Sequence, residues 1–217
     1  MVSTLRLLIG DDHPLLRQGL RKVLEARPEW EVVGEAADGR EAIRQAISLR
    51  PDVVIIDIGM PLLNGIDATQ QIVQHVPGTR VLILSMYSDE GYVTRAMQSG
   101  ATGYILKDSA GNDLLNAVEA VANRQPFFSP AVARLMLDDY VRRVNGTGVA
   151  DRYETLSARE REIFQLVAEA RTNKEVAELL DISPATVETH RGHILQKLDI
   201  HNTAELVLYA VRRGVIR

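Results

Sequence analysis

The sequence contains no cysteine among its 217 residues. This absence excludes disulfides, zinc sites built on thiolates and cysteine nucleophiles, and it suits the reducing cytoplasm, where we expect the protein to be. No apolar run approaches the roughly 20 residues that a membrane-spanning helix needs, so we expect no membrane partner. The N-terminal stretch MVSTLRLLIG is short and already contains an expected strand, which argues against a signal peptide.

The sequence also lacks an excess of basic residues. The formal net charge is −4, from 25 Lys and Arg against 29 Asp and Glu, which argues against a protein that coats nucleic acid through charge alone. Residues 1–151 carry 15 basic and 19 acidic residues, whereas residues 152–217 carry ten of each. The C-terminal third is therefore less acidic, but it is not a basic tail.

Short apolar runs alternate with longer amphipathic ones over the first 122 residues. The short runs are rich in Val, Ile and Leu, which predicts strands buried on both faces. Five strand–helix units in series predict a flavodoxin-like, doubly wound α/β domain with five parallel strands in the order 2-1-3-4-5. The expected strands are Leu5–Ile9, Val32–Ala36, Val53–Ile56, Val81–Leu84 and Gly103–Leu106, and the expected helices are about 14–27, 39–49, 65–75, 89–99 and 111–123.

The pattern changes after Asn123. The stretch RQPFFSP interrupts it, AVARLMLDDYVRRV predicts one more helix, and NGTGVAD, with its turn-forming Asn-Gly, predicts a linker. From Leu156 onward the pattern is helical throughout. We therefore expect an α/β domain over residues 1–123, a linker that includes a helix over 124–151, and a small all-α domain of four helices over 152–217.

The stretch LLIGDDHP, residues 7–14, raises a chemical question. Two adjacent carboxylates, Asp11 and Asp12, end an apolar strand, where they repel each other and are costly to desolvate. Polar residues also follow the neighbouring strands: Asp57 ends the third, Ser85 the fourth and Lys107 the fifth. Because ligands of doubly wound sheets bind at the carboxyl ends of the strands, we expect these five side chains to converge.

Three converging carboxylates need a hard cation, and oxygen ligands with open water positions suit Mg²⁺. Such a cation would offset the repulsion between Asp11 and Asp12, and it would prepare one carboxylate to attack a phosphoryl group. A lysine and a hydroxyl suit the oxygens of the transferred group. The strand ends therefore predict a site for aspartyl-phosphate chemistry.

The motifs DDHP, DIGMPLLNG and GYILKD resemble the receiver domain of two-component response regulators over residues 1 to about 123. The resemblance implies that a sensor histidine kinase phosphorylates Asp57. The Mg²⁺ ligands that it implies are Asp11, Asp12, Asp57 and the backbone carbonyl of Gly59.

The same resemblance assigns roles to three further residues. Lys107 would bind the phosphoryl group, and Ser85 and Tyr104 match the family's switch pair, in which a hydroxyl moves toward the phosphoryl group and an aromatic ring follows it inward. A different interpretation of Tyr104 is a plain half-buried strand tyrosine.

A metal-dependent phosphohydrolase would use a similar set of groups. Such an enzyme needs a general acid two residues after the nucleophilic aspartate, to protonate the leaving group. That position is Gly59 here, which has no side chain to donate a proton. We therefore expect no enzyme with a separate substrate, but a protein that takes part in its own phosphorylation and dephosphorylation.

The C-terminal segment has the pattern of a helix-turn-helix. Ser157 and Glu160 form a capping-box pattern, TNKEVAELL predicts a short helix, and DIS predicts a tight turn. Ser183 and Pro184 then begin a longer helix, whose apolar positions Val187, Ile194 and Leu198 are spaced to face the core. A short helix, a turn and a longer helix with a polar outer face are typical of DNA-binding domains.

The stretches LSARERE, TNKEVAELL and ISPATVETHRGHILQKL resemble the LuxR-type output domain of NarL/FixJ-type response regulators over about residues 155–212. The resemblance implies that the helix from Pro184 to Leu198 lies in the DNA major groove, and that the last helix, about Ala204–Arg213, pairs two copies. The implied DNA contacts are Asn173, Lys174, Thr186, Val187, Glu188, His190, Arg191, His193 and Lys197. The implied dimer contacts are Leu206, Val207, Tyr209 and Ala210.

Two residues depart from the family pattern. Ala170 stands where a glycine is usual, and Glu188 stands where a lysine is common. We favour Glu188 as a solvated acid that pairs with Arg191 or the helix dipole. The other interpretation is that its carboxylate accepts a hydrogen bond from a cytosine amino group.

These motifs predict a transcriptional response regulator in which phosphorylation controls dimerisation and sequence-specific DNA binding. The implied partners are a sensor histidine kinase, double-stranded promoter DNA, a second copy of the chain when phosphorylated, and RNA polymerase. Two alternatives remain open. One is a phosphorylation-independent DNA binder, against which the complete acid set argues, and the other is an adaptor that acts through protein contacts only.

Overall fold

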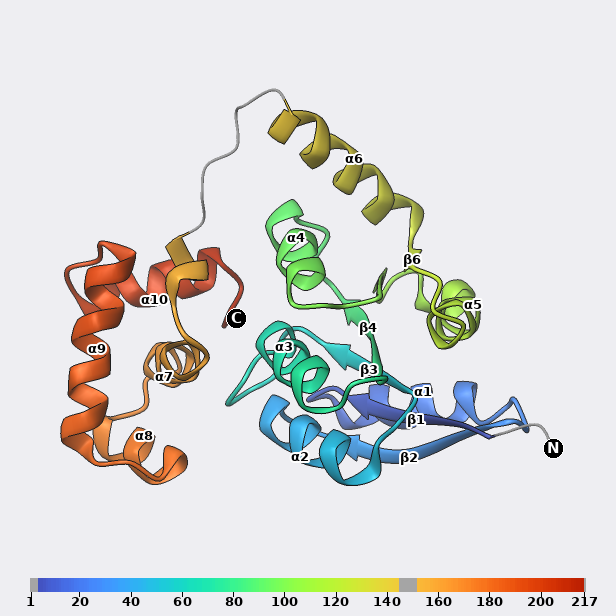
Figure 1. The fold of residues 1–217 in the computed structure, drawn as a ribbon, viewed down its shortest axis with the longest axis horizontal. Helices are drawn as coiled ribbons and strands as arrows, with labels where there is room; N and C mark the ends of the chain where they lie inside the picture. The colour runs from blue at the N-terminus through green and yellow to red at the C-terminus, as the bar shows by residue number, and fades with distance from the viewer. Residues whose placement is uncertain (1–3, 145–151, 217) are drawn as a thin grey trace. The chain divides into compact units, whose positions relative to one another are not determined.

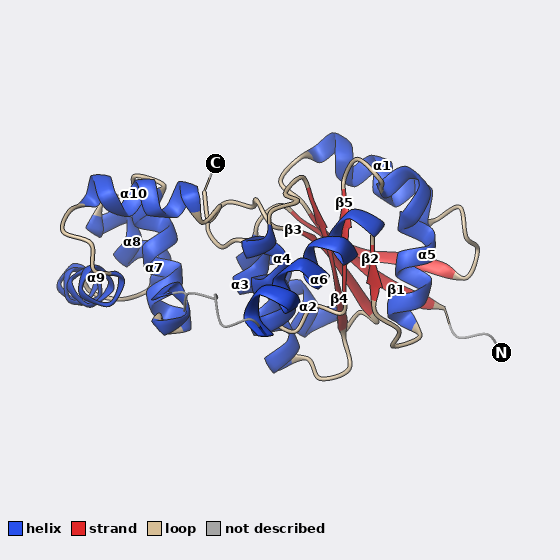
Figure 2. Cartoon of the chain, turned by 90° about the horizontal axis from the view of Figure 1, so that it is seen from above, coloured by secondary structure: helices blue, strands red, loops and turns tan. Residues whose placement is uncertain are grey.

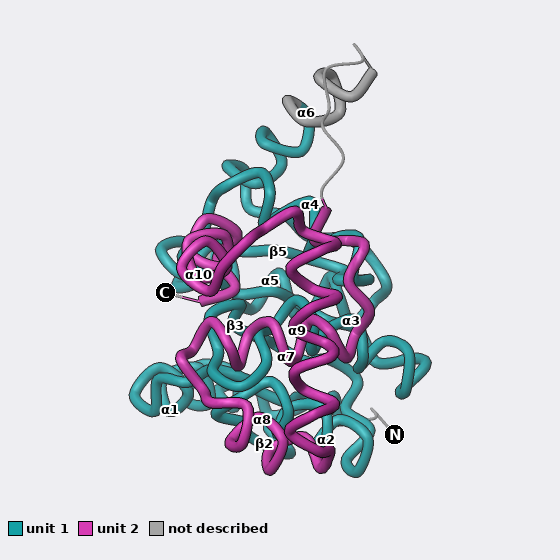
Figure 3. Tube along the Cα trace, turned by 90° about the vertical axis from the view of Figure 1, so that its left-hand side faces the viewer, with its two compact units in different colours: residues 1–147 teal, residues 148–217 magenta. Residues whose placement is uncertain are grey.

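The computed structural model describes residues 4–144 and 152–216 (Figure 1). The backbone divides into two compact units, residues 1–147 and 148–217 (Figure 3). None of the helices within the described ranges is long and apolar enough to cross a membrane.

Parallel strands form the sheet of the first unit, in the order β2-β1-β3-β4-β5-β6. The strands are β1 Leu5–Gly10, β2 Trp30–Ala36, β3 Val53–Asp57, β4 Arg80–Ser85, β5 Gly103–Leu106 and β6 Phe127–Phe128. The five predicted strands and their order are confirmed, but the predicted strand number is wrong by one. The additional strand, β6, pairs with Gly103 and Tyr104, and its two residues are too few to show a strand period in the sequence.

Helices cover both faces of this sheet (Figure 2), as the alternation of patterns predicts. Helices α1 (Pro14–Leu24) and α5 (Ala110–Ala122) lie on one face, and α2 (Gly39–Leu49), α3 (Gly65–His75) and α4 (Glu90–Gln98) lie on the other. Successive residues of β1 and β3 enter opposite clusters: Leu7 and Ile55 pack toward α1 and α5, whereas Leu8 and Ile56 pack toward α2, α3 and α4. Burial on both faces explains why these strands lack polar alternation.

The first unit continues beyond the boundary that we placed at residue 123. Helix α6 (Pro130–Val144) packs on it, because Val132 is fully buried in the cluster that also contains Tyr104, with Phe128 and Met136 against its edge. The helix that we assigned to a linker therefore belongs to the first unit, and the division lies after residue 147. The predicted linker NGTGVAD, residues 145–151, lies outside the described residues.

The second unit contains a short 3₁₀ turn, η1 (Arg152–Thr155), and four helices, α7 (Ala158–Ala168), α8 (Asn173–Leu180), α9 (Pro184–Leu198) and α10 (Thr203–Arg212), as predicted. Side-chain caps fix where these helices begin. Ser157 and Glu160 form the expected capping box, Thr172 and Glu175 form a second one, and Ser183 accepts a hydrogen bond from the backbone of α9. Phe164, Ile194 and Leu206 are among the core residues.

Ala170 joins α7 to α8 with a φ of 62°. This left-handed conformation costs an ordinary residue about 1–2 kcal/mol, because its Cβ crowds the backbone, whereas glycine adopts it freely. The position where Ala170 departs from the family pattern is therefore one at which the backbone itself favours glycine.

Candidate functional site

The predicted carboxylates converge at the carboxyl end of the sheet. Asp11 follows β1 directly and Asp57 is the last residue of β3, and both are buried, at 1% and 2% exposure. One ligand atom from each of Asp11, Asp12, His13 and Asp57 lies within 4.8 Å of all the others. Three carboxylates at this spacing supply the hard oxygen donors that Mg²⁺ prefers, so the donor set fits the predicted cation.

Lys107 connects two of these acids. It follows β5, and its Nζ donates to Asp11 Oδ2 at 2.7 Å and to Asp57 Oδ2 at 2.8 Å. Burial alone would lower the pKa of Lys107, but its hydrogen bonds to Asp11 and Asp57 outweigh burial and hold that pKa above its usual value. The structure thus gives Lys107 a second contact, with Asp11, in addition to the phosphoacceptor site to which we assigned it.

His13 is a member of this cluster that our sequence reasoning missed. Its backbone N–H donates to Asp11 Oδ1 at 2.8 Å, and its ring Nδ1 lies 2.7 Å from Asp12 Oδ1. The motif DDHP contains His13, but neither its spacing nor its type distinguishes it from a residue that merely precedes a helix.

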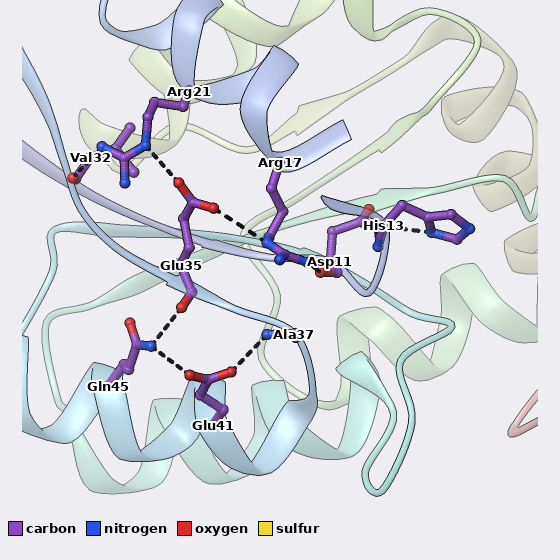
Figure 4. Close-up of polar contacts among 9 residues, drawn as sticks. All are labelled: Asp11, His13, Arg17, Arg21, Val32, Glu35, Ala37, Glu41 and Gln45. Carbon is purple, nitrogen blue, oxygen red and sulfur yellow. Dashed lines mark hydrogen bonds and ion pairs between the residues drawn. The ribbon is translucent and has the colours of Figure 1, made fainter. Parts of the chain in front are cut away.

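A second layer of charged residues holds the Asp11 loop in place (Figure 4). Arg17 of α1 donates through one guanidinium nitrogen to the Asp11 carbonyl at 2.5 Å, and through another to Glu35 of β2 at 3.3 Å. Arg21, one turn further along α1, donates to the same carboxylate at 2.6 Å. The hydrogen bond from Arg21 holds the pKa of Glu35 below its usual value, so this acid stays ionised and anchors both arginines.

Asn64 and Gly65, the last two residues of the motif DIGMPLLNG, allow α3 to begin close to Asp57. A Cβ at Gly65 would overlap the carbonyl oxygen of Asp57, so only glycine allows α3 to approach the end of β3 this closely. Asn64 caps the same helix by accepting from the backbone N–H of Asp67. Gly59 lies in the intervening loop, two residues after Asp57, and the role of its carbonyl as a Mg²⁺ ligand stays a prediction.

Ser85 and Tyr104 belong to one hydrogen-bonded group at the ends of β4 and β5. The backbone N–H of Tyr87 donates to Ser85 Oγ at 3.0 Å, and the Tyr104 hydroxyl donates to the Tyr87 carbonyl at 2.6 Å. Both Ser85 and Tyr104 are fully buried, so Tyr104 is not half-buried. Burial raises the pKa of Tyr104, although its hydrogen bond with Ser85 works in the opposite direction.

The second unit presents part of α9 to solvent. Of the residues that we assigned to DNA, Val187 is fully buried and therefore lies in the core, as its spacing also indicated. Asn173, His190 and Arg191 are partly exposed. The exposed members of the set are Lys174, Thr186, Glu188, His193 and Lys197.

Hydrogen bonds within the unit engage several of these polar residues. The Asn173 side chain donates to Glu188 and accepts from Arg191 Nη1 at 2.8 Å. Glu188 and Arg191 are therefore linked through Asn173, which the sequence did not indicate. Lys197 donates to Glu160 of α7 at 2.7 Å.

The residues assigned to dimer contacts on α10 do not share one surface. Leu206 and Ala210 are buried within their own unit, and the ring of Tyr209 packs edge-on against Phe164. Val207 is partly exposed. The large apolar side chains of α10 that do reach solvent are Leu208, at 56% exposure, and Val211, at 47%.

Comparison with known protein families gives two matches. Residues 7–119 match the model of the response regulator receiver domain. Residues 154–210 match the model of the bacterial regulatory proteins of the luxR family. The two matches cover the two compact units in turn.

Similar proteins align with nearly the whole chain. The oxygen regulatory protein NreC of Staphylococcus carnosus is 38% identical over 98% of this chain and 99% of its own length. The transcriptional regulatory protein LiaR of Bacillus subtilis is also 38% identical, over 98% of this chain and 99% of its own. RcsB from Salmonella enterica serovar Typhimurium, solved bound to promoter rprA in the presence of the phosphomimetic BeF₃⁻, is 27% identical, covers 95% of this chain and 98% of its own, and gives a TM-score of 0.61.

Proposed function

The chain belongs to the NarL/FixJ-type response regulators, the transcription regulators of two-component systems that join a receiver domain to a LuxR-type DNA-binding domain, and from this premise we propose that Asp57 accepts a phosphoryl group from a sensor histidine kinase. The observation that carries the proposal is the position of the Asp57 carboxylate. It is buried at the end of β3, 2.8 Å from Lys107 Nζ, within a cluster of two further acids.

In the proposed reaction, a carboxylate oxygen of Asp57 forms a bond to phosphorus while the bond from phosphorus to the nitrogen of a phosphohistidine breaks. Mg²⁺ held by Asp11, Asp12, Asp57 and the Gly59 carbonyl would supply positive charge to the phosphoryl oxygens. The ammonium group of Lys107 contacts Asp57 already, so it needs only a short movement to donate to a phosphoryl oxygen. Apart from this phosphohistidine donor, no separate substrate enters the scheme.

The group formed by Ser85, Tyr87 and Tyr104 would transmit the change. If the Ser85 hydroxyl turns toward the phosphoryl group, the hydrogen bond that it accepts from Tyr87 is lost. The ring of Tyr87 stacks on Tyr92 of α4, with ring centroids 4.3 Å apart. Rearrangement of Ser85 would therefore reach α4 through two tyrosines, as a local change that biases a bistable element.

The test is to label the protein with a small phosphodonor, with and without Mg²⁺, and to map the labelled residue. We expect one labelled site, on Asp57, which requires Mg²⁺ and disappears in Asp57→Ala. The matched control is Asp113→Ala, which removes a carboxylate of α5 outside the cluster. Undiminished label in Asp57→Ala would overturn the assignment.

We further propose that two copies bind double-stranded promoter DNA through the exposed face of α9, and that phosphorylation favours the pair. Support comes from the luxR-family match and from the DNA complex of the related RcsB. One α9 offers few cations for phosphates, so a single copy would bind weakly, whereas two linked copies gain affinity through effective concentration. Because the target is chromosomal DNA, the proposed location is the cytoplasm, where RNA polymerase is a further proposed partner.

For the pair, the exposed Leu208 and Val211 are better contacts than the buried Leu206 and Ala210. Leu208→Glu in the phosphorylated protein should therefore weaken binding to a DNA with two half-sites and leave binding to one half-site unchanged. Equal binding of wild type and Leu208→Glu to both DNAs would remove α10 from the proposed interface.

A further inference from the structure

A second group of metal-ligating side chains lies in the second unit, apart from the acid cluster. It consists of Glu160 on α7 and of His190 and His193 on α9, and one ligand atom from each lies within 4.8 Å of the other two. The two histidines are three residues apart on one helix, so they share a face. Two imidazoles and a carboxylate are the ligand types of zinc sites with three protein ligands.

Glu160 is held in place before any ligand arrives. Its Oε2 accepts from the Ser157 backbone N–H at 2.7 Å, from Ser157 Oγ at 2.8 Å and from Lys197 Nζ at 2.7 Å. The other carboxylate oxygen, Oε1, takes part in none of the hydrogen bonds made by the described residues. Glu160 as a whole is only 4% exposed, and the three hydrogen bonds to Oε2 fix the orientation of the carboxylate while Oε1 is available.

His190 supplies a second, independent observation. Its Nδ1 is buried and, among the described residues, has no hydrogen-bond partner. Buried polar atoms in native proteins nearly always have a partner, because an unsatisfied one costs about 1–3 kcal/mol. An imidazole nitrogen in this condition is available as a metal ligand.

We propose that Glu160, His190 and His193 form a site for a divalent transition metal of the Zn²⁺ class. The ligands of a tetrahedral Zn²⁺ lie about 2.1 Å from the metal and therefore about 3.4 Å from one another. Atoms that lie within 4.8 Å of one another need at most about 1.4 Å of closure to reach this spacing, and the exposed ring of His193 can supply it by turning. The fourth position would be taken by water. The ammonium group of Lys197 is a nearby positive charge that would repel the metal, but it donates to Glu160 Oε2 and leaves Oε1 available.

The site would couple metal occupancy to the DNA-binding face. Its two histidines lie on α9, the helix proposed to enter the major groove, and both were assigned to DNA contacts. A metal that binds them would tie α9 to α7 and withdraw both rings from DNA. The metal-binding proposal stands whether or not Asp57 is phosphorylated.

The test is calorimetric titration of the full chain with ZnCl₂ in an excess of Mg²⁺, which competes for the acid cluster. Any Zn²⁺ that still binds the acid cluster is common to all variants, so we expect one further site in the wild type, weakened at least about tenfold in both His193→Gln and His190→Gln. His201→Gln is the matched control, because His201 is an exposed histidine of the same unit outside the group, and it should bind like the wild type.

His193 is exposed, so His193→Gln leaves the core intact and decides the matter even if His190→Gln fails to fold. Unfolding by heat gives a second readout. Zn²⁺ should raise the melting temperature of the second unit in the wild type but not in His193→Gln. Equal Zn²⁺ affinity of wild type and His193→Gln, or no Zn²⁺ binding by the wild type, would overturn the proposal.

Discussion

A lysine ammonium contacts a carboxylate at 2.7 Å in each of the two units, yet the surroundings differ. Lys107 is 10% exposed and lies between Asp11 and Asp57, which are almost completely buried. Lys197 is 40% exposed, and its one partner Glu160, at 5% exposure, also accepts two hydrogen bonds from Ser157. The distance is the same, but only the first contact compensates two acids that have no access to water.

This difference explains what each contact reveals about function. Acids are buried beside each other only where something else requires them, since desolvated carboxylates are costly. The Lys107 contact therefore points to a binding site, whereas the Lys197 contact joins a partly exposed lysine to a single buried acid that Ser157 already holds, so a structural role alone accounts for it. The sequence assigned Lys107 to the phosphoryl group and Lys197 to DNA, but the contacts of Lys107 alone indicate a ligand site.

Removal of Lys107 has the largest expected effect, and removal of Lys197 is the matched change in the second unit. In EDTA, Lys107→Ala should lower the free energy of unfolding of the first unit by about 3–5 kcal/mol, because it leaves two buried carboxylates without their cation. Mg²⁺ should restore part of this loss by binding the folded state. Lys197→Ala should cost the second unit less, about 1–2 kcal/mol, because the buried Glu160 keeps its two hydrogen bonds from Ser157. Urea unfolding with and without Mg²⁺ measures both, and equal losses would contradict the distinction between the two contacts.

Glu188→Lys tests the role of charge on the exposed face of α9 in the second unit. Glu188 is exposed and bonded to Asn173, so we expect an acid that repels phosphates without reading a base. The substitution should then strengthen binding to all DNA sequences and steepen the salt dependence by about one phosphate contact. Binding measured against salt concentration and against base substitutions checks this.

Two other results would each contradict the expectation that Glu188 repels phosphates without reading a base. Relaxed preference at one position, at a cost of roughly 1–3 kcal/mol in discrimination, would show that the carboxylate reads a base. A variant that changes neither affinity nor preference would place Glu188 off the DNA.

The smallest expected effect concerns the backbone between α7 and α8. Ala170→Gly should raise the free energy of unfolding of the second unit by about 1 kcal/mol, because it relieves the left-handed strain at φ 62°, less the entropy that glycine gains in the unfolded chain. Gly192→Ala within α9 is the matched change in the opposite direction. Its added Cβ meets no atom within 4 Å, so the higher helix propensity of alanine should also raise the free energy of unfolding by about 1 kcal/mol. A lower free energy of unfolding in Ala170→Gly would contradict the proposed backbone strain at this position.

The sequence predicted best where one physical rule dominates. The strands β1 and β3 are buried on both faces, so their composition alone marks them, and parallel strands bring Asp11, Asp57 and Lys107 together by topology. The capping box of Ser157 was predictable for a similar reason, since both partners lie within one helical turn.

What could not be predicted depends on side-chain contacts between distant positions. The pairing of Arg17 with Glu35 and the Asp11 carbonyl joins two elements, and nothing local marks either residue. The bridge from Glu188 through Asn173 to Arg191 likewise links α8 to α9. Strand β6 has only two residues, which is too short to show the alternating pattern of a strand. Its position depends on Phe127 and Phe128, which pack on opposite faces of the sheet.

In the proposed mechanism, phosphorylation at the acid cluster of the first unit controls DNA binding by the second. The most direct measurement is the affinity of the full chain for a promoter DNA with two half-sites, selected from random sequences, before and after treatment with a phosphodonor and Mg²⁺. The account predicts tighter binding after treatment in the wild type and no change in Asp57→Asn. Equal affinity of treated and untreated wild type, once labelling of Asp57 is verified, would contradict control by phosphorylation and favour a phosphorylation-independent DNA binder. No DNA affinity in either state would also contradict it and favour an adaptor that acts through protein contacts only.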